Sequence, residues 1–329
     1  MPDKVRINSD APLGYEENTS ARLERARQER AVVSDLWLSF LHRMFIGQNG
    51  IRPGWRLLLY AAMTGVILLA LAQIAQRIHP DMWSQTWLLA ASESLTLIAA
   101  LAAAWIMSRI EHRPLGAYGL PALPASWRRF WAGTAWGIAS LSLLMLTLRG
   151  LGAFYFGGPA GNAARTAIAA ALYALLFVVV GFSEEFLLRG YAQFTLAQAI
   201  GFWPSAGLLS IAFGVIHLRN GGEGWLGIIT ATLFGLFFAF TLRRTGTLWF
   251  AVGVHAAWDW GQSYLYSVPD SGILLPGHML NSSIHGPAWL TGGSVGPEGS
   301  VLALILIALI WLVLHRRYPE VKYQTASGC

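Results

Sequence analysis

Long apolar stretches separated by short polar segments run along most of the 329-residue chain. A helix that crosses a bilayer needs roughly 20 apolar residues, with a range of about 17 to 25. Eight stretches approach this length, and the fifth and eighth are shorter than the others. In chain order they are Trp55–Gln76, Trp87–Ile110, Phe130–Leu148, Ala164–Leu188, Trp203–His217, Trp225–Leu242, Leu248–Leu265 and Val301–His315. The pattern predicts an all-α, polytopic membrane helix bundle with about eight transmembrane helices.

The segments outside these stretches predict a single membrane domain at residues 51–318, between tails at 1–50 and 319–329. Residues 1–18 are polar and are expected to be disordered. The next segment, from about Ser20 to Ile46, is expected to form an interfacial helix. The apolar side of that helix would carry Trp37, Phe40, Leu41, Met44 and Phe45. The segment Ser267–Ser300 is rich in Gly, Pro and Ser and has no Lys or Arg, which predicts a flexible outer loop.

Composition supports a membrane protein and gives its orientation. Hydrophobic residues make up 55% of the chain and charged residues only 12%, whereas soluble domains carry about 25% charged residues. Most Lys and Arg residues fall on one side of the eight stretches, so we expect both termini in the cytoplasm and the chain in the cell (inner) membrane. The net charge of +6 then places basic flanks against anionic lipid. Because the basic residues are scattered over loops, we expect no nucleic-acid partner.

Ionisable residues inside apolar stretches are costly and mark functional sites. The fourth stretch ends in SEEFLLR. Glu185 and Arg189 are four residues apart and share one helix face, with the acid in the favourable N-terminal position. Glu184 lies about 100° away around the helix. We therefore expect Arg189 to neutralise Glu185, and Glu184 to face a cavity.

Two further motifs follow on other stretches. SIAFGVIH places Phe213 one turn from His217, and VHAAWDWGQ places His255 one turn from Asp259. Together with Glu184 these residues supply a base, imidazoles and a polarising group, as water-driven hydrolysis of a peptide bond requires. The chain has no plausible nucleophile elbow of the GxSxG type on its apolar stretches and no HExxH on one helix. Glu93 in the second stretch is expected to hydrogen-bond between helices, and His278 and His285 are expected to be solvated.

The three motifs together resemble a known family. EEFLLR fits the pattern EExxxR, FGVIH fits FxxxH and HAAWD fits HxxxN/D, in the same order and on successive stretches. The chain in this respect resembles the CAAX protease and bacteriocin-processing family of intramembrane endopeptidases, which includes the type II CAAX prenyl endopeptidases. The resemblance covers about residues 130–265. IGQNGIRPGWRLLLY before the first stretch and RIEHRPLGAYGL after the second also look like N-terminal regions of family members.

The resemblance implies a catalytic core at about residues 130–265 with a conical cavity in the membrane. It implies that Glu184 activates water, assisted by His217, and that His255 and the residue at 259 stabilise the oxyanion. Glu185 and Arg189, with Phe213, would organise the site. Here position 259 is aspartate, and an ionised aspartate cannot donate a hydrogen bond. Asp259 is therefore either protonated, or it orients His255.

The implied activity is cleavage of a membrane-anchored peptide or protein without a cofactor. Zinc stays open as an alternative, because Glu184, His217 and His255 form the His₂Glu set of some zinc proteases. A non-catalytic immunity or scaffold protein of the same fold is a second reading of the chain. A transporter is a third, since buried acids and histidines also relay protons.

Simple helix lengths place Glu184 and His217 at different depths in the membrane. Glu184 is about 20 residues, or roughly 30 Å, from the outer end of its stretch, whereas His217 is roughly 21 Å deep from the inner side. The two side chains can share a site only if the fourth helix runs through Arg189 and residues Tyr191 to Gly201 form more helix. We therefore predict that extra helix, and that Glu184, His217 and His255 line one cavity.

Overall fold

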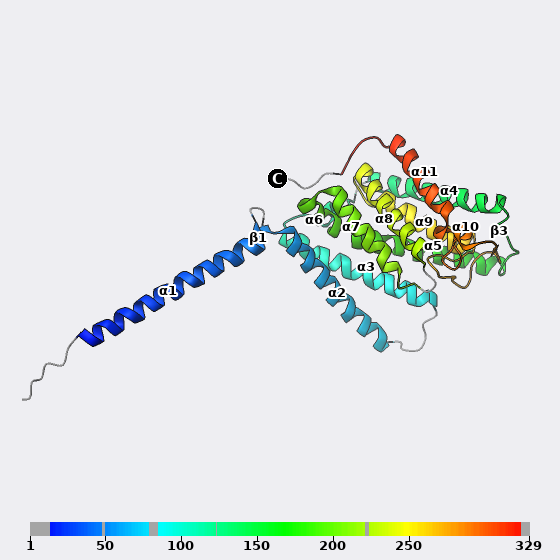
Figure 1. The fold of residues 1–329 in the computed structure, drawn as a ribbon. Coiled ribbons are helices and arrows are strands. Elements are labelled where there is room, and N and C mark those ends of the chain that lie inside the picture. The colour runs from blue at the N-terminus through cyan, green and yellow to red at the C-terminus, as the bar shows by residue number, and fades with distance from the viewer. Residues whose placement is uncertain (1–13, 48–49, 79–84, 123, 221–223, 324–329) are drawn as a thin grey trace, which may run out of the picture. The chain divides into compact units, whose positions relative to one another are not determined.

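The computed structural model describes residues 14–47, 50–78, 85–122, 124–220 and 224–323. Helices dominate these ranges, and all eight apolar stretches predicted from the sequence lie on helices (Figure 1). The chain divides into two units, Met1–Trp55 and Arg56–Cys329. The helical fold class is thus confirmed over the described residues.

The first unit consists of a long helix and a short hairpin. Helix α1 spans Gly14–Phe45, and strands β1 (Ile46–Gly47) and β2 (Gly50–Ile51) pair antiparallel behind it. The prediction that residues 1–18 are disordered is wrong from Gly14 onward, because the helix begins there; residues 1–13 lie outside the described residues. The Trp55 indole donates to Met44 O at 3.0 Å and its ring packs on Phe45. The interfacial position of α1 stays a prediction.

The second unit contains the membrane helices. Its elements are α2 (Pro53–Ile78, which starts in the first unit), α3 (Gln85–Ile110), η1 (Leu115–Tyr118), α4 (Pro124–Gly150), β3 (Phe154–Tyr155), α5 (Ala163–Arg189), α6 (Tyr191–Ile200), α7 (Phe202–His217), α8 (Trp225–Thr245), α9 (Trp249–Trp260), η2 (Gly261–Leu265), β4 (Ser283–Ile284), α10 (Ala288–Thr291), η3 (Pro297–Gly299) and α11 (Val301–Arg317). Within the described ranges, five helical segments are long and apolar enough to cross a membrane, and α7 is a shorter apolar helix. The chain is therefore a multi-pass membrane protein, and the count of eight spans stays a prediction.

A short helix between α5 and α7 resolves the mismatch in depth. Helix α5 runs to Arg189, and after Gly190 the chain forms α6 over Tyr191–Ile200. Gly201, with φ +84°, then turns the chain into α7. The extra helix predicted for this segment is confirmed. It returns the chain so that α7 packs beside α5 and against α8.

Helix α9 lies in the interior of the bundle and packs against α4, α5 and α8. The contact with α4 is made at backbone distance: a Cβ added at Gly253 would lie 2.1 Å from Phe130 O. Small residues let membrane helices approach in this way. Because α9 is enclosed on several sides, every residue from Phe250 to Asp259 is buried.

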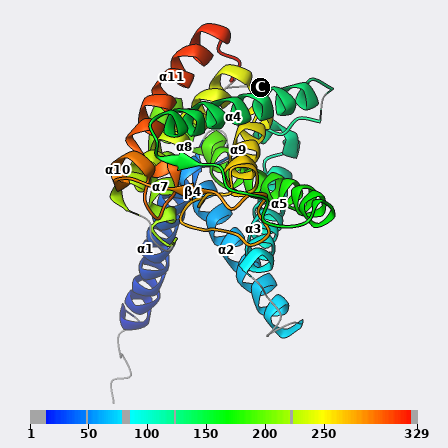
Figure 2. The same ribbon diagram turned by 90° about the vertical axis from the view of Figure 1, so that its right-hand side faces the viewer.

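The outer loop differs from its prediction. Ser267–Ser300 is not an open, unstructured loop: β4 pairs with β3, and the loop contains α10 and η3. Figure 2 shows it in orange, between α10 and α5. Val268 and Leu275 are each only 1% exposed. Backbone hydrogen bonds hold the loop in place, such as the one from Met279 N to Tyr264 O of η2 at 3.1 Å. The Gly- and Ser-rich composition that predicted flexibility is therefore compatible with close packing here.

Candidate active site

The two adjacent glutamates at the end of α5 have different surroundings. Arg189 Nη1 donates to Glu185 Oε1 at 3.1 Å, and the Glu185 side chain is 0% exposed. The Glu184 side chain is 27% exposed and lines two cavities. The geometry agrees with the division expected from helix spacing, in which one acid is paired and the other faces a cavity.

Arg189 is fully buried and is enclosed by aromatic rings. Its guanidinium carbon lies 4.3 Å from the centre of the Phe213 ring and 5.9 Å from that of Phe238. A Cβ at Gly235 on α8 would lie 2.3 Å from Arg189 Nη2, so only glycine leaves space for the cation there. Phe213 thus lies where its expected supporting role requires, against Arg189. Cation–π contacts of this kind stabilise a desolvated guanidinium by about 2 kcal/mol.

His255 on α9 is held by Glu185 and points its other nitrogen at two further acids. Its Nδ1 lies 3.0 Å from Glu185 Oε1. Its Nε2 lies 3.5 Å from Glu184 Oε2 and 3.5 Å from Asp259 Oδ2. The imidazole also stacks on Phe238, with 5.0 Å between ring centres and 8° between planes. The ring is therefore fixed in orientation, with Nε2 directed between Glu184 and Asp259.

His217 at the end of α7 has one nitrogen engaged by its own helix. Its Nδ1 lies 2.8 Å from Phe213 O, a carbonyl that can only accept. Nδ1 therefore carries the proton, and in the neutral ring Nε2 is left as an acceptor. The imidazole packs on Phe213 with 4.6 Å between ring centres.

One cavity brings the four predicted catalytic residues together. We call it the site cavity; its volume is about 120 Å³, and Glu184, His217, His255 and Asp259 all line it. Their helices α5, α7 and α9 are separate in the sequence. The shared cavity agrees with the expectation that these motifs converge, while the catalytic role of each residue stays a prediction.

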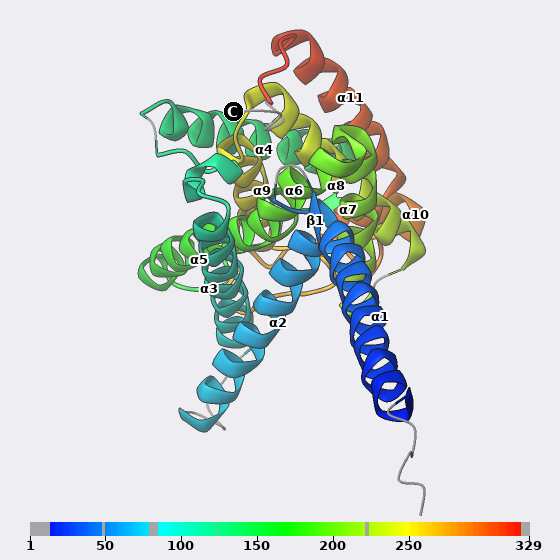
Figure 3. The same cartoon turned by 90° about the vertical axis from the view of Figure 1, so that its left-hand side faces the viewer.

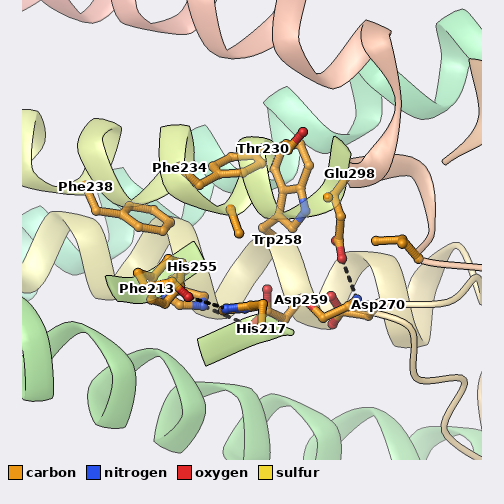
Figure 4. Close-up of a pocket in the computed structure, with 14 residues that line it drawn as sticks. Phe213, His217, Thr230, Phe234, Phe238, His255, Trp258, Asp259, Asp270 and Glu298 are labelled. Carbon is orange, nitrogen blue, oxygen red and sulfur yellow. Dashed lines mark hydrogen bonds and ion pairs between the residues drawn. The ribbon is translucent and has the colours of Figure 1, made fainter. Parts of the chain in front are cut away.

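Two further cavities adjoin the site cavity. A wide cavity of about 1100 Å³ lies among α2, α3, α5 and α7, whose courses can be followed in Figure 3. Glu184 and His217 line it, together with mainly apolar side chains such as Leu68, Leu95 and Ile216. A smaller, loop-side cavity of about 50 Å³ contains His217, His255 and Asp259 (Figure 4).

The outer loop adds two acids that the sequence interpretation missed. Asp270 and Glu298 line the loop-side cavity, and Figure 4 shows Asp270 beside Asp259. Ser263 Oγ donates to Asp270 Oδ2 at 2.9 Å, Gln262 Nε2 donates to Glu298 Oε2 at 2.6 Å, and Ser271 N donates to Glu298 Oε1. The signal available in the sequence was two acids in a loop without Lys or Arg.

Glu93 on α3 also lies at the site. It lines the site cavity and the wide cavity, in both cases with Glu184. Glu93 was expected to hydrogen-bond between helices, and that expectation did not include its position on the cavity wall. His278 was expected to be solvated, but its Nδ1 lies 2.9 Å from Leu275 O, within the folded loop, and the ring is half-buried.

The arrangement of the site side chains also bears on the zinc alternative. Within the described ranges, no group of three or more His, Cys, Asp or Glu side chains is arranged to hold a metal ion. The Glu184, His217 and His255 set therefore lines one cavity without converging on a single ligand point. Chelation, discussed below, distinguishes the two mechanisms.

The loop acids predict a pH dependence of stability. Burial raises the pKa of Asp270 well above its ordinary value, and the charge of Asp259 raises it further. Burial raises the pKa of Glu298 in the same way, with Asp270 adding to the shift. A folded-state pKa above the unfolded value means that the folded protein holds the proton more tightly. Their contribution to stability is thus full below the ordinary carboxyl pKa and is lost as pH rises through the folded-state pKa.

We expect Asp270→Asn to weaken this loss, because asparagine is neutral at every pH and its amide oxygen can still accept from Ser263. Thermal unfolding of purified protein in detergent, followed from pH 5 to pH 9, measures it. The wild-type midpoint should fall as pH rises, and the midpoint of Asp270→Asn should fall less. The control is Glu320→Gln, which removes the same charge from a side chain that is 74% exposed. Parallel curves for wild type and Asp270→Asn would contradict the prediction.

The part of the chain that contains the site matches a known family model. Residues 166–261 match the family model for type II CAAX prenyl endopeptidase Rce1-like proteins. The matched stretch contains all three motifs, from Glu184 to Asp259, and the resemblance predicted from them is confirmed. The comparison with curated proteins gives no match.

Proposed function

We propose that this chain is an intramembrane endopeptidase, because residues 166–261 match the type II CAAX prenyl endopeptidase Rce1-like family model. It hydrolyses a peptide bond of a membrane-associated peptide or protein with water activated by Glu184. The observation that carries the proposal is the site cavity, where Glu184, His217, His255 and Asp259 from three helices face a common space. The protein acts in the cell (inner) membrane with both termini in the cytoplasm.

The first chemical step is attack by water. Glu184 accepts a proton from the water, and the water oxygen bonds to the carbonyl carbon of the substrate. His217 Nε2 is free to accept the second water hydrogen, because Nδ1 is engaged by Phe213 O. With both hydrogens held, the water lone pair is directed at the carbonyl carbon, which supplies orientation in addition to basicity.

The second requirement is stabilisation of the oxyanion. His255 Nε2, carrying a hydrogen, donates to the developing negative oxygen; removal of one such donor typically costs about 100- to 1000-fold in rate. Glu185 holds Nδ1 of the same ring at 3.0 Å, and Arg189 holds Glu185. The Glu185–Arg189 pair therefore orients the donor. Asp259 lies beside Nε2 at 3.5 Å, where it polarises that nitrogen or, when protonated, donates a second hydrogen bond.

The wide cavity suits a substrate that is itself in the membrane. It is bounded largely by apolar side chains of α2, α3, α5 and α7, and it meets the site cavity at Glu184 and His217. An apolar segment or lipid anchor can occupy it while the peptide bond reaches Glu184. The partners of the protein are thus the bilayer and a membrane-anchored peptide or protein.

The test is hydrolysis by the purified protein in liposomes. A library of membrane-anchored peptides, with and without a lipid chain, is incubated with wild type and with Glu184→Ala, and products are identified by mass spectrometry. We expect cleavage by wild type only. Binding of peptides without cleavage by wild type would favour the non-catalytic immunity or scaffold protein. Proton-coupled uptake into the liposomes without cleavage would favour a transporter.

Chelation separates the glutamate mechanism from a zinc mechanism. We expect EDTA or phenanthroline to leave the hydrolysis rate within about twofold of its untreated value, since no step requires a metal. The measurement is the initial rate on one cleaved peptide, before and after dialysis against chelator. Loss of activity that stoichiometric zinc restores would assign Glu184, His217 and His255 as ligands instead.

A further inference from the structure

Peptide hydrolysis needs a second proton transfer, to the leaving group. When the C–N bond breaks, the leaving nitrogen must receive a proton, because an amide anion is a very poor leaving group. Glu184 takes its proton on the side of the attacking water, and His255 faces the oxyanion. A further acid that lines the site cavity can donate directly to the leaving nitrogen.

Glu93 stands on a different helix from the other candidate residues. It belongs to α3, whereas Glu184, His217 and His255 belong to α5, α7 and α9. Glu93 and Glu184 line both the site cavity, of about 120 Å³, and the wide cavity. A peptide bond that enters the site cavity from the wide cavity therefore meets both carboxyl groups.

The sequence of α3 explains why Glu93 faces α5. Positions at helical spacing, 89, 93, 96, 100, 103 and 107, form one side of the helix, and α3 packs against α5. Ala100 and Ala103 on this side are fully buried, and small side chains let the two helices approach closely. Glu93 lies on the same side, about two turns before Ala100, and lines the wide cavity.

The surroundings of Glu93 are polar but offer no basic partner at ion-pair distance. Among the described residues, Glu93 forms no ion pair, whereas Glu184 lies 3.5 Å from His255 Nε2. Among the described residues, no Lys or Arg lines the site cavity.

These contacts assign different protonation states to the two acids. Four carboxyl groups line the site cavity, those of Glu93, Glu184, Asp259 and Asp270. Neighbouring carboxyl groups repel when all are ionised, so at least one of them retains a proton. His255 stabilises the ionised form of Glu184. Glu93, without such a partner, is the acid that keeps its proton. Paired carboxyls whose surroundings differ in this way are typical of an acid and a base acting on one bond.

We propose that Glu93 is the general acid of the reaction, which rests on the proposed function. The water oxygen bonds to the carbonyl carbon as Glu184 takes one water proton. The C–N bond then breaks, its electron pair stays on nitrogen, and the Glu93 carboxyl proton is transferred to that nitrogen. Glu184 is left protonated and Glu93 ionised. The proton passes from Glu184 to Glu93 through water in the site cavity, which restores both groups for the next cycle.

The experiment compares leaving groups. Wild type, Glu93→Gln, Glu93→Asp and Ser94→Ala in liposomes act on two substrates with the same membrane-anchored acyl part, a peptide amide and a nitrophenyl ester. Nitrophenolate leaves without protonation. We expect Glu93→Gln to lower kcat/KM for the amide by about 100- to 10,000-fold, and for the ester by less than tenfold. Glu93→Asp should recover part of the amide activity, and the alkaline limb of the wild-type pH profile should be absent in Glu93→Gln.

Ser94→Ala is the matched control, since Ser94 lies next to Glu93 on α3 and lines none of the three cavities. It should behave as wild type on both substrates. Equal loss on amide and ester in Glu93→Gln would show a structural role and overturn the proposal, as would no loss on either. If wild type cleaves neither substrate, the proposed function is refuted, and the role of Glu93 with it.

Discussion

Glu184→Gln is expected to lower the rate of peptide hydrolysis by about 100- to 10,000-fold while leaving the folded yield unchanged. The amide has the size and shape of the carboxyl group but cannot take a proton from water, and general base catalysis contributes a factor of this order. The side chain is 27% exposed and lines the site cavity, and its contact with His255 Nε2 is 3.5 Å long, so the fold does not depend on its charge.

The measurement is kcat on a cleaved membrane-anchored peptide, with yield and size-exclusion profile recorded for each preparation. Glu184→Asp is the matched control: it keeps a base but withdraws it by one methylene, and it should retain more activity than Glu184→Gln. Robust hydrolysis by Glu184→Gln would refute both the glutamate and the zinc mechanism.

Arg189→Ala is expected to have the largest effect on stability, a loss of about 3–5 kcal/mol. The change removes the guanidinium from Glu185, whose side chain is 0% exposed and keeps only its contact with His255 Nδ1 among those described above. It also removes the guanidinium from between the Phe213 and Phe238 rings. Both losses lie in the interior of the bundle, where neither water nor a neighbouring Lys can compensate. We expect a sharply reduced folded yield in membranes and a lower unfolding midpoint in detergent.

The double variant Arg189→Met with Glu185→Gln tests the cause. If the cost of Arg189→Ala arises from an unpaired buried carboxylate, removal of both charges should restore much of the lost stability, and the two changes should be strongly non-additive. Activity should stay low, because Glu185 no longer holds His255 Nδ1 as a charged acceptor. A wild-type yield and wild-type activity in Arg189→Ala would refute the division of roles between the two glutamates.

Local features of the site were accessible from the sequence. The pairing of Glu185 with Arg189 depends only on the helical repeat, since residues four apart share a face wherever the helix lies. The same holds for Phe213 with His217, whose rings pack at 4.6 Å, and for His255 with Asp259. The eight helices were likewise predictable, because apolar length is a property of each segment alone.

The sequence by itself thus determined the helices, the three motifs and the partner of each residue one turn away. The tertiary structure decided what lies across the cavity. Glu93 and Glu184 line one cavity because α3 packs against α5, and Asp270 and Asp259 line the same cavity although one is on the outer loop and the other on α9. His255 is buried between Glu185 of α5 and Phe238 of α8. Such contacts join residues far apart in the chain, so no periodicity or spacing records them; they follow from how closely neighbouring backbones can pack.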